Sequence, residues 1–157
     1  MFVQDNLRVA MAALVLWCAW PVHPDGAAQG RTATARSIRC TFPLNATGTW
    51  KKEGPPDAAV KPAALVLLFD SINIDEGTAR LRSGSVGSEI IARLSGGYLH
   101  FIQQFRSGPL YTTTVFDKEA SGGRLKAVHS RHEYFDVPLA GATSSPEQYY
   151  GECEVMN

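Results

Sequence analysis

The sequence has no excess of either charge, because 15 lysine and arginine residues stand against 15 aspartate and glutamate residues. It also has no basic cluster that would neutralise a row of phosphates, so we expect no nucleic-acid binding.

Long apolar runs are missing too. The run Val9–Trp20 covers about 12 residues, whereas a helix that spans a bilayer needs about 20. We therefore expect no permanent membrane anchor.

Motifs of common catalytic and metal-binding classes are missing as well. The serines lie outside a Gly-x-Ser-x-Gly nucleophile elbow. The acidic stretch Asp70–Gly77 lacks the turn glycine and the closing glutamate of a helix-loop-helix calcium loop. The sequence therefore predicts no cofactor and favours a role other than catalysis.

The N-terminal segment has the three regions of a secretory signal. An arginine precedes the apolar run, and a stretch rich in proline, glycine and alanine follows it. Small residues one and three positions before the cut favour cleavage after Ala28, with a cut after Gly30 as the alternative. We expect residues 1–28 to be a signal peptide that carries Cys18 away, and the protein to be exported to the periplasm or secreted.

The remaining chain is long enough for one domain with a core of its own. Residues 29–36 are small and polar, which predicts a flexible arm, and residues 37–157 are expected to form a single β domain. Residues 45–62 contain glycines and prolines that break regular structure, so they are expected to be the longest loop.

The residues after this loop are rich in β-branched and aromatic types, are broken at short intervals by glycine, and show no sustained period of 3.6 residues. That pattern predicts an all-β fold, an antiparallel meander of about eight strands. The expected strands are residues 37–44, 64–74, 77–83, 88–95, 97–106, 109–118, 123–135 and 147–155.

Cys40 and Cys153 lie on the apolar faces of the first and last expected strands. In an exported chain such a pair is oxidised, so we predict a Cys40–Cys153 disulfide. Directly opposed residues on antiparallel neighbours have the separation that a disulfide requires, so the first and last strands should be neighbours. This favours a closed barrel of lipocalin-like size over a sandwich with paired terminal strands. The bridge leaves no free thiol in the processed chain for catalysis.

The densest polar cluster is the stretch His129–Glu133. Imidazole is a common ligand for zinc, copper and nickel, which makes His129 and His132 candidate metal ligands. On a strand, however, side chains three positions apart project to opposite faces, so the two histidines would chelate one ion only across a bulge. No metal site is predicted.

Two strand registers are open for this stretch. If Leu125 and Ala127 face the interior, His129 and Arg131 follow them and form either a structural ion pair or the polar floor of a ligand cavity. In the other register, Ser130 and His132 face inward and Arg131 is solvated.

Aromatic residues are spread over several strands. The candidate ligand or ion-pair site comprises His129, Arg131, Tyr111 and Phe101.

Residues 112–116, 123–132 and 147–153 resemble the C-terminal half of small exported bacterial proteins of unassigned function. The resemblance implies a bacterial, periplasmic or secreted setting, and it transfers no catalytic or binding residue. The sequence thus predicts an exported soluble β-barrel that binds a small ligand or a protein partner and is not an enzyme. The alternatives are a metal-dependent or hydrolytic enzyme centred on His129–Glu133, and a structural component of the cell envelope.

Overall fold

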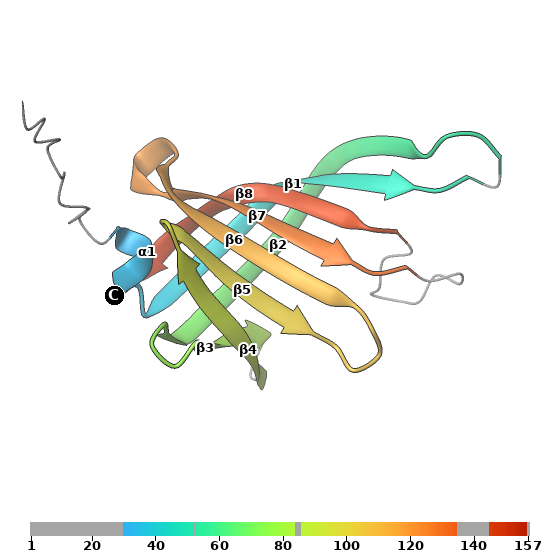
Figure 1. The fold of residues 1–157 in the computed structure, drawn as a ribbon. Coiled ribbons are helices and arrows are strands. Elements are labelled where there is room, and N and C mark those ends of the chain that lie inside the picture. Colours follow the sequence, from blue (N-terminus) through green and yellow to red (C-terminus); the bar gives the residue numbers. More distant parts are fainter. Residues whose placement is uncertain (1–29, 52, 84–85, 135–144, 157) are drawn as a thin grey trace, which may run out of the picture.

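The computed structural model describes residues 30–51, 53–83, 86–134 and 145–156, so the predicted signal peptide lies outside the described residues. A short helix and eight strands make up the fold (Figure 1). The elements in chain order are α1 (Arg31–Thr34), β1 (Ser37–Thr49), β2 (Asp57–Asn73), β3 (Thr78–Ser83), β4 (Val86–Ser95), β5 (Tyr98–Gln104), β6 (Leu110–Glu119), the 3₁₀ turn η1 (Ser121–Gly123), β7 (Leu125–His132) and β8 (Glu147–Met156).

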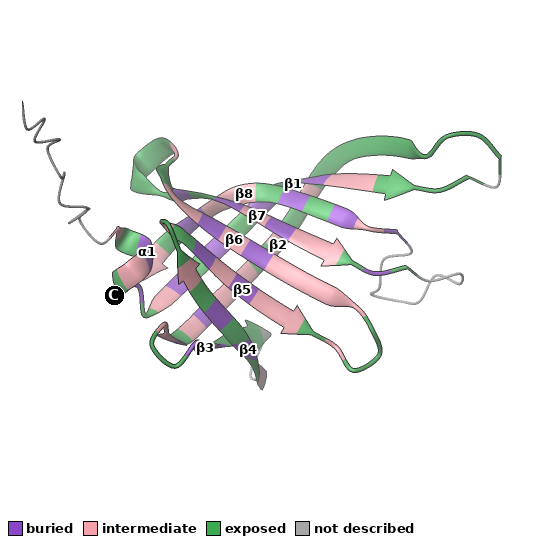
Figure 2. Cartoon of the chain, in the orientation of Figure 1, coloured by how far each residue is buried: buried purple, intermediate pink, exposed green. Residues whose placement is uncertain are grey.

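Each strand pairs antiparallel with the next along the chain, and β8 pairs with β1, so the sheet closes into a barrel. The predicted closed meander is therefore confirmed. Burial alternates along strands such as β1, β5 and β8, as a strand with one face toward a core requires, and Figure 2 shows buried bands across neighbouring strands. The short links between β2 and β3 and between β4 and β5 contain Gly77, Gly96 and Gly97, each with positive φ, which suits tight turns.

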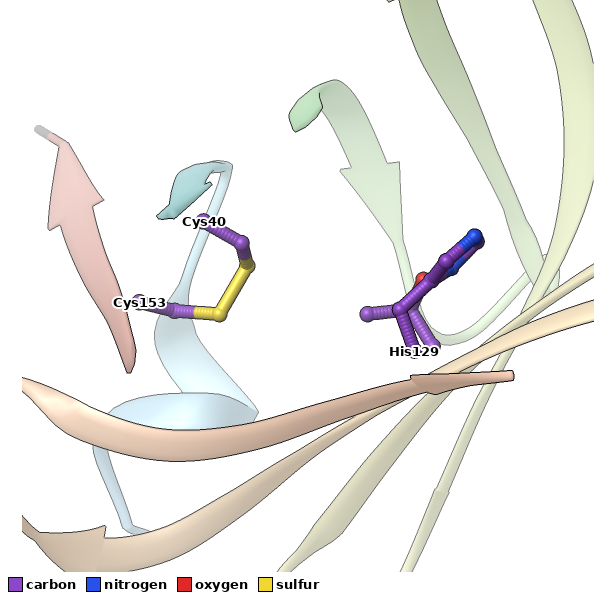
Figure 3. The surroundings of a disulfide bond; sticks show 4 residues. Cys40, His129 and Cys153 are labelled. Carbon is purple, nitrogen blue, oxygen red and sulfur yellow. A yellow bond between two sulfur atoms is a disulfide. The ribbon is translucent and has the colours of Figure 1, made fainter. Parts of the chain in front are cut away.

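The predicted disulfide joins Cys40 of β1 to Cys153 of β8 (Figure 3). The two residues lie directly opposite one another in the strand pairing, and both are fully buried. A disulfide of this kind indicates an oxidising, non-cytoplasmic environment.

Aromatic side chains fill the barrel interior. Phe69 and Phe101 stack with their ring centroids 4.0 Å apart, and Phe42 is fully buried in the same hydrophobic core. The cavity between Phe69 and Phe101 on one side and polar residues such as Thr113 and His129 on the other has a volume of about 10 Å³. That is room for about one water molecule, so the centre of the barrel is packed core.

Two expectations about the N-terminal part are corrected. In place of a flexible arm, residues 31–34 form α1, whose Thr32 is fully buried and which lies against β5 and β6. In place of a loop over residues 45–62, β1 continues to Thr49 and β2 begins at Asp57. Pro62 fits into β2 because, as shown below, one edge of this strand segment is open. Among the described residues, no helix is long and apolar enough to cross a membrane.

Candidate functional site

Polar side chains gather inside the barrel at the end opposite α1, where β6, β7 and β8 lie side by side. Strand pairing sets them in two rungs. Thr113, His129 and Tyr149 lie opposite one another in one rung, and Tyr111, Arg131 and Glu147 lie opposite one another in the next. We call these six residues together with Glu133 the mouth cluster, because they lie at the end of the barrel where β6 and β8 begin and β7 ends.

His129 is the most buried ionisable member of the mouth cluster, with 4% of its surface exposed. Its Nε2 lies 3.3 Å from Nε of Arg131, and its Nδ1 lies 2.8 Å from Oγ1 of Thr113. An arginine nitrogen can only donate, so Nε2 accepts and Nδ1 carries the proton that is donated to Thr113. Burial, together with the nearby charge of Arg131, lowers the pKa of His129 to about 4. Both ring nitrogens of a neutral imidazole are thus engaged.

Arg131 lies between two tyrosine rings. Its guanidinium carbon is 5.3 Å from the ring centroid of Tyr111 and 5.1 Å from that of Tyr149, which are cation–π distances. The two rings restrict the movement of the guanidinium plane. With Nε directed to His129, the side chain of Arg131 is fixed on three sides by described residues.

The tyrosines are held in turn by two buried carboxyl groups. The Tyr111 hydroxyl donates to Oε2 of Glu133 at 2.5 Å, and the Tyr149 hydroxyl donates to Oε2 of Glu147. Burial and the hydrogen bond to Glu133 raise the pKa of Tyr111 to about 12, and burial and the bond to Glu147 raise the pKa of Tyr149. Both phenols therefore stay protonated and keep donating.

An open depression of about 290 Å³ lies against the mouth cluster. Its lining comes mostly from the outer face of the sheet, including Ala58 of β2, Ser130 and His132 of β7 and Gln148 of β8, with Arg131 and Glu147 of the mouth cluster among them. Further out, the rings of Trp50 and Tyr134 meet edge to face at 5.8 Å, and each side chain is largely exposed. This end of the barrel therefore combines a fixed cation, carboxyl oxygens and exposed aromatic rings.

The structure selects the register in which His129 and Arg131 face inward, and it leaves His132 exposed on the outside. The two histidines thus lie on opposite faces, as strand geometry requires. In the part of the chain that the structure describes, no three histidine, cysteine or acidic side chains converge as a metal site would need. Phe101 lies below the cluster, stacked on Phe69, and lines the small internal cavity with Tyr111 and His129.

Sequence reasoning missed Thr113, Glu133, Glu147 and Tyr149 as members of the site. A signal for two of them was present, because Tyr149 shares the face of Cys153, and strict alternation extends that face to Glu147. For Glu133, which follows the last residue of β7, strand alternation offers no equally firm guide.

The fold and the mouth cluster together define an eight-stranded antiparallel barrel with a packed centre and a polar open end. Comparisons with protein-family models, with curated proteins and with solved structures found no match. Functional inference therefore rests on the geometry of this chain.

Proposed function

We propose that this chain is an exported binding protein that takes a small polar ligand at the barrel mouth. The arrangement of Arg131 carries the proposal. A guanidinium held between two rings, with each ring oriented by a buried carboxyl group, has lost its freedom before any ligand arrives. Such preorganisation reduces the ordering cost of binding, and layered support of this kind is typical of binding sites.

The chemistry of the lining narrows the ligand class. Arg131 offers hydrogen-bond donors and positive charge, which suit a carboxylate or another group rich in lone pairs. Carboxyl oxygens have more lone pairs than one tyrosine hydroxyl uses, so Glu147 can also accept from a ligand donor. We infer a small molecule that carries an acceptor and a donor close together, such as an amino acid or a hydroxy acid.

The packed centre supports a ligand at the mouth over one in the barrel interior. The cavity between the aromatic core and the mouth cluster, with a volume of about 10 Å³, has room for no organic ligand. A ligand would therefore reach Arg131 and Glu147 from the end of the barrel.

The test is calorimetric titration of the processed protein with a panel of amino acids, hydroxy acids, simple carboxylates and simple amines. We expect the bifunctional compounds to bind and Arg131→Met to reduce their affinity at least about tenfold, since a charge-assisted hydrogen bond contributes about 1.5–3 kcal/mol. Arg39→Met, on an exposed position of β1, is the matched control and should bind as the wild type does. Failure of every compound on the panel to bind, or equal binding by Arg131→Met, would refute the proposal.

A further inference from the structure

One edge of β2 is open. β2 pairs with β3 only from Leu68 to Asn73, while its pairing with β1 continues outward to Asp57. Within the described residues, no strand therefore pairs with residues 57–67 of β2 on the side away from β1. Figure 1 shows the consequence, because the β1–β2 hairpin extends well beyond the rest of the barrel, and Figure 2 shows that its outer part is exposed.

An open edge presents backbone groups that can pair with another strand. In an antiparallel pair, alternate residues direct their N–H and C=O groups away from the partner, so every second residue of this segment directs them outward. Val60, in the middle of the outer segment, is 66% exposed, which is more than any other large hydrophobic side chain described. The segment thus offers both unpaired backbone and apolar surface.

We propose that this edge pairs with the same edge of a second copy of the chain, antiparallel and across a two-fold axis at Ala59. In that register Asp57 of each copy lies directly opposite Lys61 of the other, and Ala58 lies opposite Val60. Because of the two-fold symmetry, this pair of opposite charges occurs twice in the interface, as in any isologous contact. β1 and β2 of the two copies then form one continuous four-stranded sheet.

Charge complementarity selects this register over its neighbours. An axis at Val60 would place Lys61 opposite Ala59 and Asp57 opposite Ala63, which pairs no charges. An axis at Lys61 would bring two lysines together, and like charges directly opposed destabilise a sheet. Asp57 also contacts Lys51 of its own copy at 2.6 Å, and a carboxylate has lone pairs for both ammonium groups.

Prolines limit the length of the paired segment. Pro56 and Pro62 lack the backbone N–H and flank residues 57–61 on either side. So short an interface falls below the area of about 1,200 Å² at which specific interfaces are stable. The dimer is therefore weak and depends on concentration. It involves no residue of the mouth cluster, although Ala58 also lines the depression beside that cluster.

Cross-linking tests the register directly. In the variant Ala59→Cys the two introduced cysteines lie opposite each other on the axis. Their Cα atoms are then about 4.5–5.5 Å apart, a separation that a disulfide accepts. With the native Cys40–Cys153 bridge intact, this variant should oxidise to a covalent dimer within minutes in a mild glutathione redox buffer. Ala64→Cys, on the same exposed edge but far from the axis, is the matched control and should remain monomeric. Equal cross-linking of both variants, or of neither, would overturn the proposal.

Charge exchange tests the interaction itself, by sedimentation velocity up to about 1 mM protein, a range that suits a weak complex. The wild type should show reversible dimerisation. Lys61→Asp and Asp57→Lys should each weaken it at least about tenfold by opposing like charges. The double variant should restore it. Lys118→Asp, the same charge change on an exposed position of β6, should leave it unchanged. A wild type that is monomeric throughout, or a double variant no better than the singles, contradicts the pairing.

Discussion

Acidification from pH 7 to pH 4 should lower the free energy of unfolding by about 3 kcal/mol through His129 alone. Folding lowers the pKa of this imidazole from 6.5 to about 4, because burial and the charge of Arg131 disfavour the imidazolium. Each pH unit between the folded and unfolded pKa corresponds to about 1.4 kcal/mol, which leads to the stated magnitude.

The direction follows from which state takes up the proton. Above pH 6.5 the imidazole is neutral in both states, and its contribution to stability is complete. Between pH 6.5 and pH 4 the unfolded chain binds a proton that folded His129 does not, so stability falls as pH falls. Below pH 4 both states are protonated and no further loss arises from this residue.

Urea unfolding, followed by tryptophan fluorescence at several pH values, measures this loss. Because other groups titrate in the same range, the comparison is between variants. Between pH 6.5 and 4, the slope of the unfolding free energy against pH should be smaller in His129→Gln than in the wild type, by the contribution of about one proton. His132→Gln, at an exposed position of the same strand, should keep the wild-type slope. If His129→Gln and the wild type show the same slope, the assignment of a neutral, buried imidazole is wrong.

Two further perturbations test the packing and closure of the barrel. Gly151→Ala should destabilise by about 2 kcal/mol or more, because a Cβ there would lie 2.0 Å from the backbone oxygen of Thr41 and 2.7 Å from Cα of Phe42. Gly48→Ala, where a Cβ meets nothing within 4 Å, is the control and should cause little or no loss in thermal denaturation, and equal losses would contradict the packing. Replacing Cys40 and Cys153 together by alanine should lower the free energy of unfolding by about 4–5 kcal/mol, because the bridge closes a loop of 113 residues. A loss under about 1 kcal/mol in urea titration would show that the bridge hardly restricts the unfolded chain.

The sequence was sufficient for the strand order and for barrel closure because both depend on local signals. Alternation and glycine turns indicated the meander, and the parity of Cys40 and Cys153 indicated that its ends meet. The inward register of His129 and Arg131 was one of two alternatives, since a one-residue slip exchanges the faces of a strand. Only the pairing of β7 with its neighbours decided it.

The extension of β1 and β2 was missed for a different reason. Glycine and proline in residues 45–62 argue against a strand with partners on both sides, and turn propensity was the strongest local signal there. With one edge open, however, a missing N–H at Pro62 breaks no ladder on that side. In β1, Pro43 lies where the register shifts against both β2 and β8, so the irregularity is absorbed by a bulge. Proline thus marks an edge and a bulge here, and not the end of a strand.

The Cys40–Cys153 bridge also turns most of the barrel into a covalent ring. Every residue between the two cysteines belongs to that ring, which contains β2 to β7 and all their connections. A protease that cuts any single connection within it opens the ring but releases no fragment. The disulfide keeps the two pieces joined, and each strand next to the cut keeps its hydrogen-bonded pairing with its neighbours in the sheet. In an oxidising environment, where proteolysis acts on exposed loops, one nick therefore does not separate the strands that carry the mouth cluster.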